Sequence, residues 1–416
     1  MNKKPIEQHS IADGQNAATM AHALQGTRIL DLTSVIMGPY GTQILADHGA
    51  DVIFVEHPKS TGTRELGAQD FAELSGISLN LLRNKRSLSI DLKKPEGRSA
   101  LLHVAASCDA VVTNLRPTPL KRLGLTGDDF LAANPEIIFC QAIGFPGDSE
   151  RADDPAYDDI IQSECGLADA YQRVTGLPQL CPTILADKVC GLVIANSIMT
   201  ALLHKQKTGQ GQKIEIPMID VMKAFMMVEH GANGVTDPDA GDAGYMRILN
   251  SERGPQKTSD GWIMILPYGP EAYDAIFQAG GRNDLVGDPR TRGRGLMTNA
   301  EYLYAQLRPI IATRTTAEWL TFCRQNKIPV GAVEGLNDIV RDYPVADHPV
   351  VGSYRLVPPP VRFSVTPAQI RQPAPMPGEH TEELLLEAGL DEPSLASMEK
   401  RGIIRRRPAK EPVAGL

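Results

Sequence analysis

Cysteine is scarce, and its arrangement suggests neither a metal centre nor a disulfide scaffold. The 416 residues include six Cys and nine His. No two cysteines form a Cys-x-x-Cys pair, no His stands at zinc-finger spacing from them, and the histidines form no metal-spaced set. Most of the cysteines lie within apolar runs, which is typical of reduced, buried thiols. We therefore expect no bound metal and a cytoplasmic location.

An excess of positive charge and a long apolar run are also missing. The formal net charge is −8, from 42 Lys and Arg against 50 Asp and Glu, which argues against a general nucleic-acid or membrane-surface binder. No apolar run reaches transmembrane length, since the one that follows Asp187 is interrupted by Asn196 and Ser197. Residues 1–25 lack the apolar core of a signal peptide. We expect a flexible arm there, and neither nucleic acid nor membrane among the partners.

Strand and helix patterns alternate through the first half of the chain. Arg28–Thr33 predicts a strand, Thr42–His48 a helix and Asp51–Glu56 a second strand. Such units build a parallel α/β sheet. Gly-x-Gly-x-x-Gly is absent from the first turn, which argues against a nucleotide-binding or redox protein of the ordinary dinucleotide-binding type. Further strands are predicted at Ser87–Leu92, Asp109–Leu115, Glu136–Phe145 and Lys213–Ile216.

The length and the position of a glycine-rich stretch predict two domains. A chain of 416 residues with 42% hydrophobic residues can form a large core and a second, smaller one. Gly231–Gly244 is rich in Gly, Asp and Ala and indicates a linker. Strands predicted at Tyr245–Leu249 and Trp262–Pro267, followed by helices, indicate a small α+β domain. We place the large domain at residues 26–230 and the linker with the small domain at 231–330.

The stretch from Pro182 to Met218 contains the strongest candidate for chemistry. Asp187 begins a long apolar helix that ends in basic residues and glycine. An Asp at this position is most simply a helix cap. The same helix end would also keep a carboxylate ionised with a low pKa, and an ionised carboxylate can attack an acyl group. Local sequence physics leaves both interpretations open.

Five segments, in the same order along nearly the whole chain, resemble the family III CoA-transferases, which include formyl-CoA and carnitine CoA-transferases. Together they are far more specific than any one of them. The segments are Leu30–Pro39 with Asp47–Glu56, Asn84–Ser87 with Leu92–Gly97, Asn114–Pro117 with Leu123–Leu125, Ala186–Asp187 with Lys207–Gln212, and Pro377–Thr381.

This resemblance implies a fold and a reaction. The fold would be α/β: a Rossmann-like large domain with a parallel sheet, to which residues 331–416 return, plus a small α+β domain, in an interlocked, ring-like homodimer. The reaction would move coenzyme A from an acyl-CoA to a free carboxylic acid, both of them substrates, with no tightly bound cofactor. Asp187 would form a mixed anhydride and then an aspartyl-CoA thioester, which is covalent catalysis. Oxyanion donors should surround its carboxyl group.

The resemblance also implies which residues contact CoA. An acidic protein that binds a phosphorylated ligand needs local cations, and Lys85, Arg86, Arg116 and Arg122 lie near predicted strand ends. Each is otherwise an ordinary solvated surface charge. Asn114 would hydrogen-bond the ligand or form a turn after its strand. The implied CoA-contacting residues are Ile36, Met37, His57, Leu82, Lys85, Asn114, Leu115, Arg116, Arg122, Ile143 and Phe145.

Departures from the family pattern argue against two substrates and leave two alternative functions open. Formyl-CoA transferase has His and Gln at the positions of Ser34 and Ile36, and Arg at that of His57, so formyl-CoA and oxalate are not expected here. The general expectation is a C4–C5 dicarboxylate such as succinate. The related acyl-CoA racemases need a His just before an Asp, and the corresponding stretch Ala156–Asp159 has none. A racemase is therefore the second hypothesis, and a non-catalytic CoA-binding protein the third.

Overall fold

The computed structural model describes residues 22–59, 62–67 and 73–407. The chain divides into two compact units, which we describe separately. The larger unit consists of Met1–Gln162, Pro182–Lys223 and Tyr343–Leu416, and the smaller of Ser163–Cys181 and Ala224–Asp342. Three boundaries thus differ from the predicted ones: residues 163–181 and 224–230 belong to the smaller unit, and the chain returns at Tyr343 rather than at 331.

A six-stranded parallel sheet organises the larger unit, in the order β3-β2-β1-β4-β5-β6. The predicted parallel α/β sheet is therefore confirmed. The strand order reverses between β1 and β4, and ligands of open α/β sheets bind beside the carboxyl ends of the strands at such a point. The strands are β1 (Arg28–Leu32), β2 (Asp51–Glu56), β3 (Lys85–Ser89), β4 (Ala110–Thr113), β5 (Ile138–Ile143) and β6 (Lys213–Pro217).

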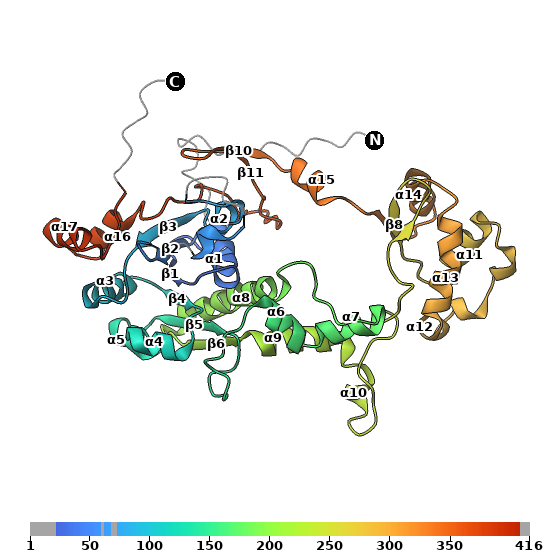
Figure 1. Cartoon of the computed structure of the whole chain (residues 1–416), viewed down its shortest axis with the longest axis horizontal. Coiled ribbons are helices and arrows are strands. Elements are labelled where there is room, and N and C mark those ends of the chain that lie inside the picture. Colours follow the sequence, from blue (N-terminus) through green and yellow to red (C-terminus); the bar gives the residue numbers. More distant parts are fainter. Residues whose placement is uncertain (1–21, 60–61, 68–72, 408–416) are drawn as a thin grey trace. The chain divides into compact units, whose positions relative to one another are not determined.

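Helices cover both faces of this sheet (Figure 1). On one face α1 (Met37–Asp47) packs against α8 (Leu185–Thr208), and α8 also contacts β5 and β6. On the other face Leu30, Ile53 and Val111 share an apolar core with α3 (Pro95–Ala105), α5 (Gly127–Ala133), α16 (Thr381–Glu387) and α17 (Glu392–Lys400). The remaining elements are α2 (Gly76–Leu81), α4 (Pro117–Leu123), α6 (Asp158–Glu164), and the hairpin β10 (Val345–His348) and β11 (Gly352–Arg355).

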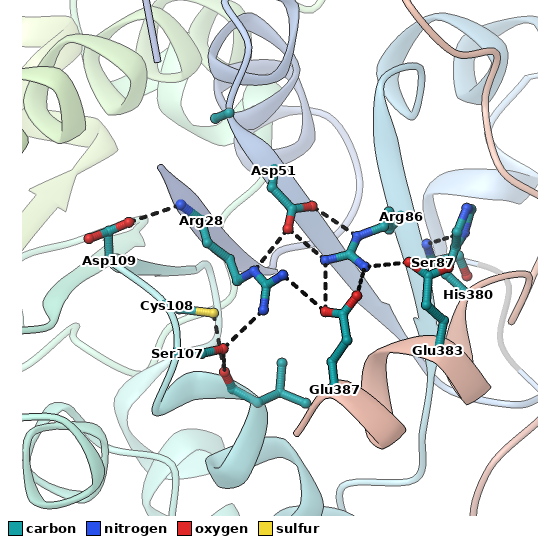
Figure 2. A network of polar contacts seen from close by, with 12 residues as sticks. Arg28, Asp51, Arg86, Ser87, Ser107, Cys108, Asp109, His380, Glu383 and Glu387 are labelled. Carbon is teal, nitrogen blue, oxygen red and sulfur yellow. Dashed lines mark hydrogen bonds and ion pairs between the residues drawn. The ribbon is translucent and has the colours of Figure 1, made fainter. Parts of the chain in front are cut away.

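An ion cluster at the amino edge of the sheet ties the last helices to the first strands (Figure 2). Asp51 of β2 accepts bonds from Arg28 of β1 at 2.9 Å and from Arg86 of β3 at 2.6 Å. Glu387 of α16 accepts from the same two guanidinium groups, each at 2.9 Å, and Glu383 also accepts from Arg86. We call these five residues the amino-edge ion cluster. Arg86 is thus engaged at the edge opposite the strand carboxyl ends, and its predicted role as a cation for CoA is wrong.

The smaller unit has its own core around a three-stranded antiparallel sheet. Trp319, Tyr273 and Phe277 are fully or almost fully buried, and Trp319 Nε1 donates to the carbonyl of Ile311 at 2.8 Å. Tyr245–Leu249 forms turns rather than the predicted strand. The elements are β7 (Gln256–Lys257), β8 (Trp262–Ile265), β9 (Val330–Ala332), α7 (Leu167–Thr175), α10 (Ala232–Thr236), α11 (Pro270–Ala279), α12 (Gly295–Thr298), α13 (Ala300–Ile311), α14 (Thr316–Gln325) and α15 (Leu336–Arg341); α9 (Met218–His230) has residues in both units.

Candidate active site

A cavity of about 180 Å³ lies at the carboxyl edge of the sheet, where the strand order reverses. The loops after β1, β4 and β5 and the first turn of α8 surround it. Asn114 joins two of these loops, because its amide donates to the carbonyl of Ser34 and accepts from the Ser34 N–H. The lining residues are Ser34, Val35, Met37, Asn114, Arg116, Ala142, Ile143, Gly144, Asp154, Pro155, Ala156, Tyr157, Asp187 and Met218.

Asp187 is the third residue of α8 and faces this cavity with only 8% of its surface exposed. It is not the cap of its helix, so the simpler of the two sequence interpretations is wrong. Ile184 occupies the N-cap position without a side-chain bond, and the Asp187 N–H donates to Asp158 Oδ1 at 3.0 Å. Asp158, at the start of α6, therefore satisfies a free N–H of α8. This leaves the Asp187 carboxyl group free to face the cavity.

Gln162 holds Asp158 in this position. Its amide nitrogen donates to Asp158 Oδ2 and, at 3.2 Å, to the carbonyl of Thr183. Asp158 and Gln162 are both buried. Gln162 thus connects α6 to the segment just before α8, and it holds the Asp158 carboxylate next to Asp187.

The surroundings of Asp187 raise its pKa to about 6. Burial makes the largest contribution, and the negative charge of Asp158 adds to it; a hydrogen bond from the Met37 N–H acts in the opposite direction. The predicted low pKa is therefore wrong, because the helix end does not outweigh desolvation and a neighbouring carboxylate. Above pH 7 the group is still mostly ionised. It is a more basic, poorly solvated carboxylate, which suits a nucleophile.

Two glycines allow α1 to approach α8 closely enough for this contact. A Cβ atom on Gly191 would lie 2.8 Å from the Met37 carbonyl oxygen and 2.8 Å from Tyr40 Cδ1. A Cβ on Gly41 would lie 2.7 Å from the Gly191 carbonyl oxygen. All three distances are shorter than those that real Cβ atoms show. The glycine crossing therefore brings the first turn of α1, with the Met37 N–H, to the carboxyl group of Asp187.

Val35, in the loop before α1, has a φ of 68°. A β-branched residue in the left-handed region is strained. Val35 lines the cavity between Ser34 and the first turn of α1, so the strained residue belongs to the wall of the candidate site.

A second cavity, of about 560 Å³, lies between the loop after β3, the start of α3, and α4. Four of its nine lining residues are cations: Lys93, Lys94, Arg98 and Arg122. None of them forms an ion pair within the described residues 22–59, 62–67 and 73–407. Such a concave basic surface favours an anionic ligand. Leu92, Pro95, Leu115, Pro119 and Leu123 complete the lining.

The structure distributes the predicted CoA contacts over these two cavities and the core beneath them. Met37, Asn114, Arg116 and Ile143 line the first cavity, and Leu115 and Arg122 the second. His57 has a side chain that is 40% exposed, with Nε2 at 3.7 Å from Asp91 Oδ1. The other four, Ile36, Leu82, Lys85 and Phe145, are buried.

Lys85 departs most clearly from its prediction. Its side chain is fully buried, and Nζ donates to Asp31 Oδ2 at 3.0 Å, Thr42 Oγ1 at 2.8 Å and the Pro39 carbonyl at 2.9 Å. An ammonium group with three protein acceptors cannot also bind a solvent-borne phosphate, so its predicted side-chain contact with CoA is wrong. Its bonds instead fasten the start of α1 to β1.

Sequence reasoning missed several residues at both cavities. Lys93, Lys94 and Arg98 were not among the predicted contacts, although two adjacent lysines before a Pro at a helix start are a usable signal for an anion site. As residues at a helix start, Tyr157 and Asp158 are candidates from the sequence to face the site, but nothing local links Asp158 to a helix 29 residues further on. Ser34 is identified only as the position at which formyl-CoA transferase has a His, and Val35 and Asp154 carry no sequence signal of their own for this site.

Metal and membrane features add no further candidate. No group of three His, Cys, Asp or Glu side chains that could hold a metal ion occurs among the residues whose structure is described. The six cysteines all lie in the described part of the chain, and no disulfide joins them there. By length and composition α8 could cross a membrane, but its buried residues pack against α1 and the sheet, as in a core helix.

Comparison with known proteins places this geometry in a family. The model of CoA-transferase family III matches residues 24–381. The chain is 30% identical over 401 residues to formyl-CoA:oxalate CoA-transferase of Afipia carboxidovorans, covering 88% of this chain and 93% of that one. It is 29% identical over 401 residues to succinyl-CoA:glutarate CoA-transferase of Mus musculus, and the match covers 93% of this chain and 91% of that one.

A solved structure gives the same result for the fold. A CaiB/BaiF family protein from Brucella suis superposes with a TM-score of 0.74 at 25% identity, over 88% of this chain and 99% of that one. Three observations lead to the same conclusion: the sheet with its strand-order reversal, the cavity at that point, and the family match over most of the chain. The protein belongs to CoA-transferase family III and is an enzyme of that family.

Proposed function

We propose that the chain transfers coenzyme A from an acyl-CoA thioester to a free carboxylic acid, with Asp187 as the nucleophile. The observation that carries the proposal is the Asp187 carboxylate itself. It is buried, has a raised pKa, lies at a cavity beside the strand carboxyl ends, and receives a backbone N–H from α1. Its homologues include CoA-transferases with different acids as substrates.

The proposed reaction proceeds through two kinds of covalent bond to Asp187. A carboxylate oxygen attacks the thioester carbonyl, the C–S bond breaks, and CoA leaves as the thiolate, giving a mixed anhydride. The thiolate then attacks the Asp187 carbonyl carbon and expels the donor acid as a carboxylate, giving an aspartyl-CoA thioester. The acceptor carboxylate attacks this thioester and releases the thiolate, which finally attacks the acceptor carbonyl and restores Asp187. No net proton transfer is required.

The Met37 N–H supplies the electrostatic part of this mechanism. It donates to the carboxyl group of Asp187, and each attack on the Asp187 carbonyl places negative charge on one of its oxygens. A fixed backbone donor at that oxygen stabilises the charge without reorganisation. The glycine crossing of α1 and α8 is what holds this donor in place.

The second cavity suits the nucleotide end of CoA. Its four cations face one space of about 560 Å³, and Leu115 and Arg116 lie next to each other in sequence, one on each cavity wall. Lys93, Lys94, Arg98 and Arg122 would hold the phosphates, while the pantetheine thiol would reach the first cavity. We therefore regard CoA as a substrate held by its phosphates, not as a tightly bound cofactor.

We also propose that the active enzyme is a homodimer of interlocked chains. Leu192, Met199 and Leu203 of α8 are between 39% and 53% exposed, and a second copy would cover them. The six cysteines, none of them in a disulfide within the described residues, agree with a reducing, cytoplasmic location. Sedimentation equilibrium at micromolar concentration tests the dimer, and a monomer that retains activity would contradict it.

Mass spectrometry tests the covalent intermediate directly. The protein is incubated with a panel of acyl-CoA thioesters, quenched with hydroxylamine or borohydride, and digested. We expect a modified Asp187 peptide and loss of CoA exchange in Asp187→Asn. A racemase would instead exchange solvent deuterium into the acyl α-carbon without modifying the protein. The first cavity disfavours that alternative, since no histidine is among its described lining residues.

A further inference from the structure

A fully buried ion pair lies beneath the loop that leads into α1. Asp31 of β1 and Lys85 of β3 have no exposed surface, and Lys85 Nζ lies 3.0 Å from Asp31 Oδ2. The Thr42 hydroxyl of α1, which is also fully buried, donates to Asp31 Oδ2 at 2.5 Å and accepts from Lys85 Nζ at 2.8 Å. We call these three residues the buried clamp, and they connect β1 and β3 to α1.

The remaining bonds of the clamp go to the two ends of the loop. Lys85 Nζ donates to the Pro39 carbonyl at 2.9 Å, so its three protons have three acceptors. Asp31 Oδ1 accepts from the Thr33 N–H at 3.0 Å and from the Thr33 hydroxyl at 2.5 Å. The clamp therefore holds the loop at Thr33, where β1 has ended, and at Pro39, in the first turn of α1.

Stability alone is a weak reason for this arrangement. Moving two charges out of water costs about as much free energy as their attraction returns, so well-packed apolar residues could fill the same space. Burial works against the charged form of Lys85 and lowers its pKa, while Asp31 acts in the opposite direction. The polar residues add what apolar ones could not, a set of directed bonds to the loop.

The loop that the clamp holds ends in the donor to Asp187. Met37 is the first residue of α1, and its N–H bonds the Asp187 carboxyl group. Val35 has a φ of 68°, a conformation that persists only where the surrounding structure imposes it. A Cβ atom on Gly38 would lie 2.2 Å from Thr33 Cβ, so the two ends of the loop are in contact. The clamp thus fixes a short, strained loop whose end carries the N–H donor.

We propose that the buried clamp positions the Met37 N–H at the Asp187 carboxyl group and thereby sets the rate of CoA transfer. This rests on the proposed function, in which each attack on the Asp187 carbonyl places charge on an oxygen next to that N–H. A fixed donor stabilises such charge without reorganisation, and a displacement of about 1 Å can lower a rate about a hundredfold. The clamp residues are fully buried, so they act through the loop and touch no substrate.

Thr42→Val tests the clamp, because valine nearly keeps the shape of threonine and lacks the hydroxyl. We expect kcat to fall about tenfold to a hundredfold, and the KM for acyl-CoA to change less than about twofold, since the cations of the second cavity are untouched. Thr42→Ser keeps the hydroxyl and should retain most of the activity. Thr381→Val is the matched control: Thr381 is fully buried and accepts from the Ser89 N–H at 2.9 Å, so its loss should lower stability without changing kcat.

Removing both charges together separates positioning from stability. Either charge left alone would destabilise the fold strongly, so Asp31→Asn is combined with Lys85→Met. We expect this double variant to unfold at nearly the same urea concentration as the original protein, and its kcat to fall as in Thr42→Val. A purely structural clamp predicts the reverse, lower stability with the original kcat per folded molecule. Circular dichroism shows which variants are folded, and Thr42→Val carries the test if the double variant is not.

The ionisation of Asp187 provides a measurement that needs no CoA transfer. The Met37 N–H lowers the pKa of this group, whereas burial and the charge of Asp158 raise it, so loosening the loop should raise it further. Asp187→Asn removes the buried charge, and the stability it adds grows with pH until Asp187 is fully ionised in the folded protein. In the Thr42→Val background this growth, measured by urea unfolding from pH 4 to 8, should extend about one pH unit higher.

The clamp and the proposed function fail in different ways. The upward shift in the Thr42→Val background supports the positioning of the donor even if Asp187→Asn retains CoA transfer, which would overturn the proposed function. The clamp is refuted if folded Thr42→Val keeps the original kcat and pH range, or if Thr381→Val lowers kcat equally. Arg116 and Asp154, the other charged residues that line the cavity, are the same in both backgrounds and cannot cause the shift.

Discussion

Replacing Asp187 by Asn should abolish CoA transfer and yet stabilise the fold at neutral pH. The two side chains have nearly the same shape, so packing is kept. The pKa of Asp187 rises from 3.8 to about 6 on folding, and each pKa unit corresponds to about 1.4 kcal/mol. An ionised Asp187 therefore costs the folded state about 3 kcal/mol, which the neutral amide avoids.

The upward direction of the pKa shift determines how the stability difference between the two proteins depends on pH. Below about pH 4 Asp187 is protonated in both the folded and the unfolded state, so its raised pKa makes no difference between them. Between about pH 4 and 6 the unfolded chain loses this proton while the folded protein keeps it, and the original protein loses stability relative to Asp187→Asn. Above about pH 7 the difference should be constant at about 3 kcal/mol.

Urea denaturation of both proteins from pH 4 to 8 measures the difference, with transferase activity assayed in parallel. Asp154→Asn is a suitable control, because Asp154 lines the same cavity but has a side chain that is 50% exposed and paired with Arg151. It should change stability by no more than about 1 kcal/mol. If the Asp187→Asn protein is no more stable than the original, or if its advantage does not grow between pH 4 and 6, the electrostatic account of this site is refuted.

Four further predictions concern the same two cavities. The kcat/KM should fall about tenfold per pH unit below pH 6 as Asp187 is protonated, and a profile that is flat to pH 5 would contradict this. Asp158→Asn keeps an acceptor for the Asp187 N–H but removes a negative charge, so the midpoint of that pH profile should move to lower pH. Asp158→Ala also removes the acceptor, so it should in addition lower the free energy of unfolding in urea by about 1 kcal/mol. Gly191→Ala should cost about 1–3 kcal/mol and lower kcat, because its Cβ would force α1 away; the exposed Asn196→Ala on the same helix should do neither. Arg98→Gln should raise the KM for acyl-CoA about tenfold and leave that for the acceptor acid unchanged, and equal changes in both would place the phosphates elsewhere.

The sequence predicted the sheet well because its signals are local. Apolar runs bounded by turn residues locate β1, β2 and β4, and helical spacing locates α8. These features depend on neighbours within about ten residues, which a single sequence records.

The missed features depend on partners that are distant in sequence. Lys85 is usually an exposed residue type, and its burial requires Asp31, 54 positions earlier. Asp158 acts on α8 across 29 residues. In the smaller unit, alternating apolar residues predict a strand at Tyr245–Leu249, but the side chain of Asn250 bonds the backbone on both sides and forms a turn instead. No local pattern reports any of these pairings.

The amino-edge ion cluster and the apolar core under α16 and α17 join the two ends of the chain. Arg28 and Glu387 are 359 residues apart, so their contact cannot form on the ribosome until nearly the whole chain has emerged. Contacts of such long range are the slowest to form. Until then the parts of the larger unit that flank the smaller unit in sequence are not joined, so the chain is still open and can be threaded with a second chain. Closing the cluster turns it into a loop. If the homodimer is interlocked, threading must therefore come before α16 and α17 dock on the larger unit. Two chains that have already closed could assemble only after these helices detach, which breaks both the ion cluster and their apolar core.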